Sequence, residues 1–502
     1  DAMTDNRIQS IVILGGGTAG WMAAAALAKR FNPQLTRITL IESADIGTIG
    51  VGEATVPFIK EFLSSLDIDE RDFMQHTQAT YKLAIEFDGW KKAGASFLHP
   101  FSGYGAAISK IPFHHFWIKM MAQQQAEPLD TYCLASQIAR HHKFALPKPS
   151  NNSDTSAFNY AFHFDAGLFA KYLSKLAQAL GVVRIEGRVE QVMQHPDSGF
   201  IEALQLTNGE TISGDFFIDC SGFRGLLIEQ TLKTGYETWA QWLPCDTAVA
   251  LPSSNSDALA PYTRSLACGA GWQWRIPLQH RTGNGYVYAS SYISDADALT
   301  ELQRNLEGDA LAEPHLIKFT TGMRKQTWNK NVFSLGLASG FMEPLESTSI
   351  YMIQSGINTL IDYFPGKHWH ASVMDEVNNT LRIRQEKLRD FLILHYKLNG
   401  REGEAFWDDC RHMKIPDSLA AQIELYQQSA QVSLGNLDFF RTSSWLAMFA
   451  GLDFMPEHYH PFVDNFDTQE VARELRNIAS SIRSAVMPLP SHREFITRNL
   501  GK

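Results

Sequence analysis

The sequence predicts an α/β fold in which a parallel-sheet module comes first and a helix-rich module comes last. Near the N-terminus, a glycine-rich turn joins a β-branched run to an alanine-rich run, as in a strand–turn–helix unit. Short apolar runs typical of strands follow, and from about Met374 onward the pattern is helical with few strand-like runs. We therefore expect one module over residues 1–373, with inserted substrate-facing segments at about 76–150, and a second module over 374–502 that packs on it.

The composition limits the class of protein. Of the 502 residues, 44% are hydrophobic and 20% are charged, which is usual for globular proteins and excludes a disordered chain, a collagen and a small disulfide scaffold. The 44 basic and 54 acidic residues give a net charge of −10. Because there is no basic run, this acidic balance argues against nucleic acid or an anionic membrane as a partner.

Cysteine spacing and hydropathy bear on the compartment. The five cysteines lie far apart without a CxxC or zinc-ligand spacing, which suits reduced thiols. No apolar run reaches the roughly 18 residues that span a bilayer, and the N-terminus has no signal-peptide pattern. We therefore expect a cytoplasmic protein. We also expect no metal site, because the two His-x-His pairs, at His368 and His458, lack a third ligand at a set spacing.

The first elements follow from residue type and spacing. Ile8–Leu14 is rich in β-branched residues and predicts a strand. Gly15–Gly20 is the turn, and the alanine-rich run Trp21–Arg30 predicts a helix that ends before an Asn-Pro step. Thr36–Glu42 predicts the next strand, so the unit has the right length for a βαβ crossover.

Later elements of the same module are also readable. They are a helix over Ala166–Leu180, a strand over Val182–Met193, a hairpin over Phe200–Ser213 closed at Asn208-Gly209, and a buried strand over Asp215–Asp219. The strand that ends at Asp219 and the segment around Gly336 look like further returns of the chain to one dinucleotide.

The glycine turn has the spacing of a dinucleotide-binding site. Gly15-x-Gly17-x-x-Gly20 permits a tight turn and backbone access to a pyrophosphate, and the helix N-terminus then faces the anion. Glu42 ends the second strand, 22 residues beyond Gly20, where an acid binds a ribose hydroxyl. A glycine-rich turn without a ligand does not explain Glu42, and several returns of the chain favour FAD over NAD. The predicted cofactor-binding residues are Gly15, Gly17, Thr18, Ala19, Gly20, Glu42, Asp219 and Gly336.

Three further segments carry a resemblance to a known family. Trp272–Pro277 is WQWRIP, Gly50–Pro57 is GVGEATVP, and Gly340–Thr348 is GFMEPLEST. Together with GGGTAGW at Gly15–Trp21, they resemble the motifs of the flavin-dependent tryptophan halogenases, in which WxWxIP separates halogenases from related flavin monooxygenases. The resemblance covers most of the chain, and it implies a Rossmann-like FAD-binding module of the flavin monooxygenase type with a helix-rich substrate module.

The resemblance also implies the chemistry of that family. A separate NAD(P)H-dependent flavin reductase supplies reduced FAD, and oxygen and a chloride or bromide ion then give hypohalous acid, which travels through a tunnel to a lysine beside the aromatic substrate. The match places that lysine at Lys82 and its partner carboxylate at Glu346. The remaining assignments are Ala54 and Leu345 at the cofactor and Thr348 and Ser349 at the halide.

Residue chemistry agrees with these roles without requiring them. A lysine can donate a hydrogen bond to hypohalous acid or be halogenated itself, and a carboxylate can stabilise the cationic ring and accept its proton. By type alone, Lys82 is a solvated lysine and Glu346 an acid at a helix start. Thr348 and Ser349 open a predicted helix whose free N–H groups suit a halide, and a plain N-cap is the alternative.

The substrate side departs from the family pattern. His99 and Phe101 lie where the family places an aromatic sandwich around the substrate, and ordinary packing explains them equally well. The tyrosine pair that holds the amino-acid group of free tryptophan is replaced by Trp445-Leu446, which lacks the two hydroxyl groups. We therefore expect the substrate to be an indole without that group, or another electron-rich arene, with Trp445 among its contacts.

Two other functions stay open. One is a flavin-dependent aromatic monooxygenase that hydroxylates its substrate, and the other is a flavoprotein that binds FAD and an aromatic ligand without turnover. Trp272 and Trp274 point to one side if their segment is a strand, and either core packing or the lining of the flavin side explains them. A homodimer is one option for the assembly.

Overall fold

The computed structural model describes residues 5–44, 52–148 and 157–501. The chain forms two compact units, each built from three separate segments. The first unit comprises residues 1–79, 164–244 and 319–385, and the second comprises 80–163, 245–318 and 386–502. These units follow a different division from the predicted modules. The assignment of cofactor binding to 1–373 and of substrate binding to 374–502 stays a prediction.

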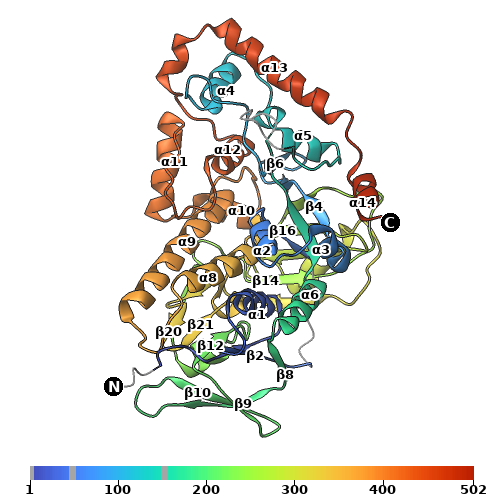
Figure 1. Ribbon diagram of the computed structural model, residues 1–502. Coiled ribbons are helices and arrows are strands. Elements are labelled where there is room, and N and C mark those ends of the chain that lie inside the picture. Colours follow the sequence, from blue (N-terminus) through green and yellow to red (C-terminus); the bar gives the residue numbers. More distant parts are fainter. Residues whose placement is uncertain (1–4, 45–51, 149–156, 502) are drawn as a thin grey trace. The chain divides into compact units, whose positions relative to one another are not determined.

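A six-stranded sheet forms the centre of the first unit (Figure 1), in the order β20-β21-β12-β1-β2-β8. β1 pairs in parallel with β2 and β12, and the parallel pairing continues to β8 and β21, whereas β20 is antiparallel. The strands are β1 (Ser10–Leu14), β2 (Arg37–Glu42), β8 (Val183–Glu186), β12 (Phe216–Asp219), β20 (Trp328–Asn329) and β21 (Val332–Ser334). Helix α1 (Thr18–Arg30) joins β1 to β2, which confirms the predicted strand–turn–helix–strand unit.

A hairpin extends from this unit and contains one departure from the predicted elements. β10 (Ile201–Leu206) and β11 (Thr211–Ser213) are antiparallel around Asn208-Gly209, as predicted. The single strand predicted over Val182–Met193 is wrong: it is two strands, β8 and β9 (Val189–Gln194), which belong to different sheets. The break falls at Gly187, where a Cβ atom would lie 2.8 Å from Leu206 Cδ1.

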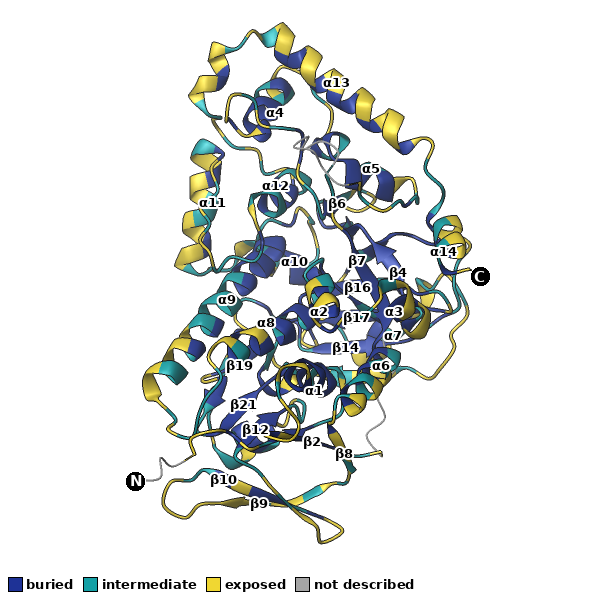
Figure 2. Ribbon diagram, viewed as in Figure 1, coloured by how far each residue is buried: buried dark blue, intermediate teal, exposed yellow. Residues whose placement is uncertain are grey.

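Helices and short strands complete the first unit. α1 packs against α6 and α8, α2 packs against α8, and α3 packs against α6. Figure 2 shows α1 and the central strands as buried. The elements are α2 (Ile59–Ser65), α3 (Glu70–Thr77), α6 (Ala166–Ala179), α8 (Ser349–Asp362), β3 (Gly52–Ala54), β13 (Tyr236–Thr238), β19 (Gly322–Arg324), β22 (Gly340–Phe341) and the short helices η3 (Leu226–Thr231), η4 (Gly336–Ala338) and η5 (Pro344–Glu346).

The second unit contains a seven-stranded sheet in the order β18-β14-β17-β16-β15-β5-β6. Only the β5–β15 pair is parallel among these described strands. The strands are β5 (Ala84–Asp88), β6 (Ser96–Pro100), β14 (Thr247–Ala250), β15 (Tyr262–Cys268), β16 (Gly271–Pro277), β17 (Thr282–Tyr288) and β18 (His315–Lys318). The WQWRIP motif is therefore the middle strand of this sheet.

Helices make up the C-terminal part of the second unit, as predicted. α9 (Ala371–Lys397) is shared by the two units, and after it the described chain up to Leu500 forms helices and loops. α13 is buried along one face and exposed along the other (Figure 2). The remaining elements are β4 (Thr80–Lys82), β7 (Ala161–Asp165), α4 (Phe113–Ala122), η1 (Leu129–Tyr132), α5 (Leu134–Arg140), α7 (Asp295–Arg304), α10 (Ala405–His412), α11 (Asp417–Ser429), α12 (Thr442–Gly451), η6 (Pro461–Asn465), α13 (Thr468–Val486) and α14 (His492–Leu500).

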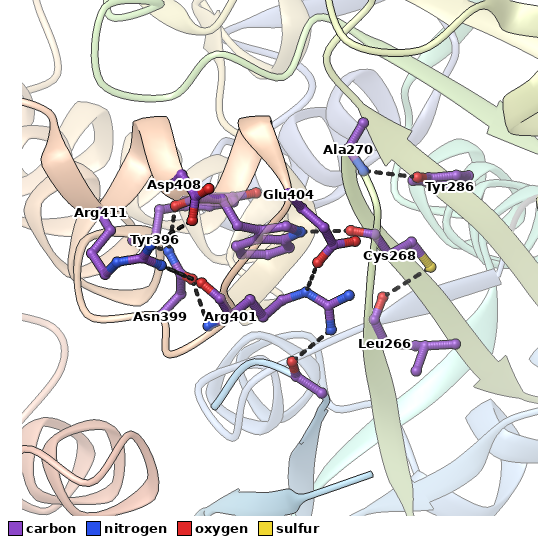
Figure 3. Close-up of polar contacts among 12 residues, drawn as sticks. Leu266, Cys268, Ala270, Tyr286, Tyr396, Asn399, Arg401, Glu404, Asp408 and Arg411 are labelled. Carbon is purple, nitrogen blue, oxygen red and sulfur yellow. Dashed lines mark hydrogen bonds and ion pairs between the residues drawn. The ribbon is translucent and has the colours of Figure 1, made fainter. Parts of the chain in front are cut away.

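Polar contacts fix α10 and the chain before it to this sheet (Figure 3). The Trp407 indole N–H donates to the Cys268 carbonyl at 2.6 Å, and Arg401 Nε donates to Glu404 Oε1 at 2.7 Å. Arg401 also donates to the carbonyl of Gly89, at the start of the β5–β6 turn, at 2.9 Å. The chain between α9 and α10 is thus tied to the β5–β6 turn. None of the helices in the described ranges is long and apolar enough to cross a membrane.

Candidate active site

Close backbone approaches explain the first and last glycines of the N-terminal turn. Gly15 has φ +118°, and a Cβ there would lie 2.1 Å from the Cys220 carbonyl oxygen. A Cβ on Gly20 would lie 1.8 Å from the Gly15 carbonyl oxygen. Neither position has room for a side chain, so both glycines are needed to form the turn.

The space beside Gly17 is open, in contrast. A Cβ on Gly17 would meet nothing within 4 Å, and Gly17 is the N-cap of α1. No side chain caps this helix, and its first turn holds no acidic residue. Thr18 and Ala19, the first two helical residues, are half-buried. The free N–H groups and the open space fit a pyrophosphate at the helix N-terminus.

Glu42 lies against the same turn. Its Oε2 accepts a hydrogen bond from the Trp21 indole at 3.4 Å, and its Oε1 pairs with Arg184. A Cβ on Gly16 would lie 1.5 Å from Oε2. The carboxylate is therefore held beside the glycine turn, where the sequence places the ribose ligand.

The two later segments also reach this turn. Asp219 is the register partner of Leu14 at the end of β1, and Leu335 N–H donates to the Asp219 carbonyl at 3.0 Å. Gly336 has φ +65°, and a Cβ there would lie 2.8 Å from Ala19 Cβ. The fold thus brings together the glycine turn, Glu42, Asp219 and Gly336, which lie far apart in the sequence.

The Asp219 side chain has a structural task. Oδ1 accepts from the Ser221 N–H, and Oδ2 accepts from the N–H groups of Leu227 and Ile228, each at 2.9 Å. The fully buried carboxylate thereby fixes the π-helical turn η3 to the end of β12. A direct contact of this side chain with the cofactor stays a prediction.

Ala54 and Leu345, the two cofactor residues assigned by resemblance, are both buried, in β3 and η5. Gly50 and Val51 of the GVGEATVP motif lie outside the described residues. Burial raises the pKa of Glu53 to about 7, so this carboxyl is partly protonated near neutral pH. No local pattern in the sequence singles out Glu53.

The EPLEST segment forms a sharp turn into a helix. Glu346 is fully buried at the end of η5, and Ser347 follows with φ +59°. α8 then begins at Ser349 with Thr348 as its N-cap, and no side chain caps it. The predicted helix start is confirmed. Because the Thr348 side chain does not cap the helix, a halide would not have to displace it.

Lys82 is fully buried, unlike a solvated lysine. It lies in β4, which pairs with β7 so that Lys82 faces Ala161 and Thr80 faces His163. Its Nζ lies 5.2 Å from the centroid of the Phe101 ring, within the range of a cation–π interaction. The structure thus brings together two of the predicted site residues.

A buried hydrogen-bond network holds β4. The Thr80 hydroxyl donates to the Pro277 carbonyl at 2.6 Å, so it accepts from His163 Nδ1 at 3.0 Å. His163 Nε2 then accepts from the Thr263 hydroxyl at 2.8 Å. Burial, and secondly the charge of Lys82, hold the His163 pKa well below its ordinary value. The Thr80 hydroxyl thus links the lysine strand to the last residue of WQWRIP, and a neutral histidine with its proton on Nδ1 links Thr80 to Thr263.

A second buried histidine holds the neighbouring residue of β4. The Tyr81 N–H donates to His492 Nε2 at 3.1 Å, and His492 Nδ1 donates to the Leu259 carbonyl at 3.0 Å. Burial lowers the pKa of His492 to about 3, so this ring is also neutral. Neither histidine could be assigned from the sequence, because nothing in the local pattern links them to β4.

His99 and Trp445 belong to one aromatic cluster. His99 Nε2 is 2.8 Å from the Ser444 hydroxyl oxygen, and the His99 ring centroid lies 5.9 Å from those of Phe391 and Phe440. The Trp445 ring lies 5.1 Å from Phe391. The Trp445 Nε1 is buried and has no hydrogen-bond partner among the described residues. Sequence reasoning missed Phe391, on α9, and Phe440, just before α12; tertiary packing brings their ring centroids within 4.1 Å of each other.

Trp272 and Trp274 point to the same side of β16, as predicted. Their ring centroids are 6.4 Å apart, and Trp272 is buried whereas Trp274 is half-buried. A Cβ on Gly285 of β17 would lie 2.0 Å from Trp274. The glycine therefore makes room for the indole.

Two further predictions concern the pairing of Lys82 with Glu346 and the absence of a metal site. Glu346 belongs to the first unit and Lys82 to the second, and their pairing stays a prediction. Within residues 5–44, 52–148 and 157–501, no three His, Cys, Asp or Glu side chains gather in a way that could hold a metal ion.

Comparisons with known proteins give one consistent family. The tryptophan halogenase family model matches residues 10–468. The chain is similar to the solved structure of BrvH, a flavin-dependent halogenase from Brevundimonas sp. BAL3, with 45% identity, a TM-score of 0.96 and coverage of 98% of this chain and 100% of that one. Xcc4156, a flavin-dependent halogenase from Xanthomonas campestris, gives 43% identity, a TM-score of 0.94 and 98% coverage of both chains. Tryptophan 6-halogenase SttH from Streptomyces toxytricini is 33% identical over 98% of each chain, and its solved structure has a TM-score of 0.89.

Proposed function

This chain belongs to the tryptophan halogenase family and is a flavin-dependent halogenase, and from that premise we propose how its residues halogenate an electron-rich arene such as indole. The observation that carries the proposal is the placement of Lys82. It is buried beside Phe101, on a strand that is locked to the WQWRIP motif through Thr80 and Pro277. A lysine without a functional role would ordinarily be exposed to solvent.

FAD would be held by the first unit. The open space at Gly17, the uncapped N-terminus of α1 and the carboxylate of Glu42 suit its pyrophosphate and ribose. Ala54, Gly336 and Leu345 would complete the site. When bound in its reduced form, FAD supplies the two electrons with which oxygen and a halide ion yield hypohalous acid and water. The uncapped first turn of α8 at Thr348 and Ser349 would hold the halide.

Lys82 would fix the position of the hypohalous acid. Its ammonium group donates a hydrogen bond to the oxygen of the acid, so that the halogen faces one carbon of the substrate ring. Halogen transfer to that carbon leaves hydroxide, which a proton converts to water. Glu346 would then accept the proton that the ring loses as aromaticity returns. The burial of both side chains excludes water, which would otherwise compete for the halogen.

The substrate would lie against Phe101, His99 and Trp445. The cluster is aromatic, and it offers one donor, the indole N–H of Trp445, which has no partner among the described residues. A buried N–H without a partner costs about 1–3 kcal/mol, so an acceptor on a bound arene would be favoured there. One N–H group does not balance the two charges of a free amino acid, which supports an arene without an amino-acid group.

A separate NAD(P)H-dependent flavin reductase would supply the reduced FAD. None of the five cysteines forms a disulfide, which supports the cytoplasm as the working compartment. A homodimer remains an option for the assembly.

Product mass tests the proposal. The protein is incubated with FAD, a flavin reductase, NADH, bromide or chloride, and a panel of arenes that includes indole. Products whose mass changes with the halide support the proposal. A hydroxylated product without halide indicates a monooxygenase, and no oxygen consumption with reduced FAD indicates a flavoprotein without turnover. The Lys82→Ala variant should lose halogenation and keep FAD binding, so comparable halogenation by this variant would contradict the assigned role.

A further inference from the structure

A cavity of about 530 Å³ lies within the second unit, apart from the residues assigned above. One wall comes from β6 and the other from the C-terminal half of α12 and the chain after it. Residues of α4, η1 and α5 close the cavity. Its apolar lining includes Phe97, Leu98, Trp117, Met121, Ala447 and Gly451. The volume is in the range that binds small organic molecules.

The cavity and the lysine site share one continuous wall. β6 runs from Phe97, which lines the cavity, through His99 to the residue before Phe101, which contacts Lys82. At about 3.3 Å per residue, Phe97 and Phe101, which are four residues apart, are separated by about 13 Å. α12 follows β6 over this distance, since Ser444 is bonded to His99 and a Cβ on Gly451 would lie 2.2 Å from the Phe97 ring.

The charged groups at the cavity are paired. Lys91 forms an ion pair with Asp453, and Arg140 forms one with Asp130. All four residues line the cavity. Because each charge has an opposite partner, the cavity offers no unbalanced charge to a ligand. An ionic ligand would have to break one of these pairs, so a neutral ligand is favoured.

Tyr104 offers a hydrogen-bond donor to a neutral ligand. Tyr104 lines the cavity and is largely buried. Burial holds the pKa of Tyr104 well above its ordinary value, so the phenol keeps its proton and donates. The lining thus suits an apolar group that carries one hydrogen-bond acceptor.

We propose that this cavity binds the remote end of an extended substrate, a neutral aryl group about 13 Å from the ring that is halogenated. The inference rests on the proposed function for the position of the reacting ring at Lys82. It makes indole the minimal substrate, and it makes arenes with a long apolar substituent the better ones. Binding of the remote group would lower KM without changing the chemistry at Lys82.

The experiment compares three substrates and four proteins, the wild type and three variants. The substrates are indole and two indoles with a terminal acetophenone group on a methylene chain, one chain short and one long enough to span about 13 Å. Ala450 lines the cavity and is half-buried on α12, so Ala450→Phe fills the cavity. Ala420→Phe, at an exposed position of α11, is the matched control. Tyr104→Phe removes the donor and keeps the ring.

We expect the wild type and Ala420→Phe to have a KM for the long-chain indole that is at least about tenfold lower than for the short-chain indole. Ala450→Phe should lose this preference and halogenate indole at the rate of the wild type. Tyr104→Phe should raise KM for the long-chain indole a few-fold and leave indole unaffected. An unchanged preference in Ala450→Phe, or an equal loss for all three substrates, would overturn the proposal.

A calorimetric titration separates this inference from the proposed function. The long-chain indole is titrated into the wild type and into Ala450→Phe without halide or reductase. Tighter binding to the wild type supports the cavity site even if no halogenated product forms, in which case the proposed function alone fails. Equal binding to both proteins overturns the cavity site even if indole is halogenated.

Discussion

Thr80→Val tests the link between the WQWRIP motif and the strand that carries Lys82. Valine has the shape of threonine without its hydroxyl, so the substitution deletes two hydrogen bonds and leaves the packing of β4 in place. The lost bonds are the one to the Pro277 carbonyl at 2.6 Å and the one from His163 Nδ1 at 3.0 Å. Thr80 and His163 are both fully buried, so water does not replace them.

The magnitude follows from the groups left behind. A buried donor without a partner costs about 1–3 kcal/mol, and the His163 N–H becomes such a donor. The Pro277 carbonyl also loses its hydrogen-bond donor, which adds to this cost. We therefore expect the unit that contains β4 to lose about 2–4 kcal/mol of stability in total. Lys82 lies two residues along the same strand. A shift of its Nζ by about 1 Å would lower halogenation on the order of a hundredfold.

The assay compares Thr80→Val with Thr80→Ser, which keeps the hydroxyl. Urea denaturation reports the stability, the rate of indole bromination reports the activity, and a titration with FAD reports the cofactor site. We expect Thr80→Ser to stay close to the wild type in all three. Thr80→Val should lose stability and bromination while FAD affinity is unchanged, because the FAD residues lie in the other unit. If both variants brominate alike and unfold at the same urea concentration, the hydroxyl does not position Lys82.

Three other predictions concern the cofactor, the substrate and pH. Gly17→Val should abolish FAD binding, because the valine side chain would occupy the place of the pyrophosphate. The protein should stay folded, since the φ of −80° at Gly17 and the open space beside it tolerate a side chain. Normal FAD affinity in a fluorescence titration would show that the turn does not belong to the cofactor site. When indole and tryptophan compete at equal concentrations with bromide present, indole should be brominated in clear preference, mostly at C3. The reason is that the zwitterionic amino-acid group of tryptophan loses several kcal/mol of solvation beside Trp445. Preferential bromination of tryptophan would contradict this. The protein should lose stability as pH falls through about 6.5, by up to about 1.4 kcal/mol per pH unit for each of the buried histidines His163, His492 and His115, the last of which lies on α4. Burial keeps the pKa of each below that of the unfolded chain, so only the unfolded state takes up the protons, and a denaturation midpoint that does not change between pH 7 and pH 5 would contradict it.

Several features could be determined from the sequence because they depend on neighbours in the chain. The spacing of Gly15, Gly17 and Gly20 predicted the turn, and the structure confirms a helix that starts there and a strand that ends at Glu42. The helix that opens at Thr348 and the helical C-terminal part were equally readable. Each rests on a local periodicity or on a turn that only certain residues allow. The family, too, was identified from short motifs of this kind.

Other features were decided by tertiary structure alone. By its type Lys82 is a surface residue, and only the pairing of β4 with β7 buries it and brings Thr80 to His163. Trp445 could be singled out, but not its contact with Phe391, more than fifty residues earlier in the chain. The prediction of a single strand over Val182–Met193 was wrong for the same reason. Apolar and polar residues alternate in the same way whether the segment forms one strand or two strands that belong to different sheets. Residue type and periodicity describe a segment, whereas burial and the choice of partner depend on which distant segment lies beside it.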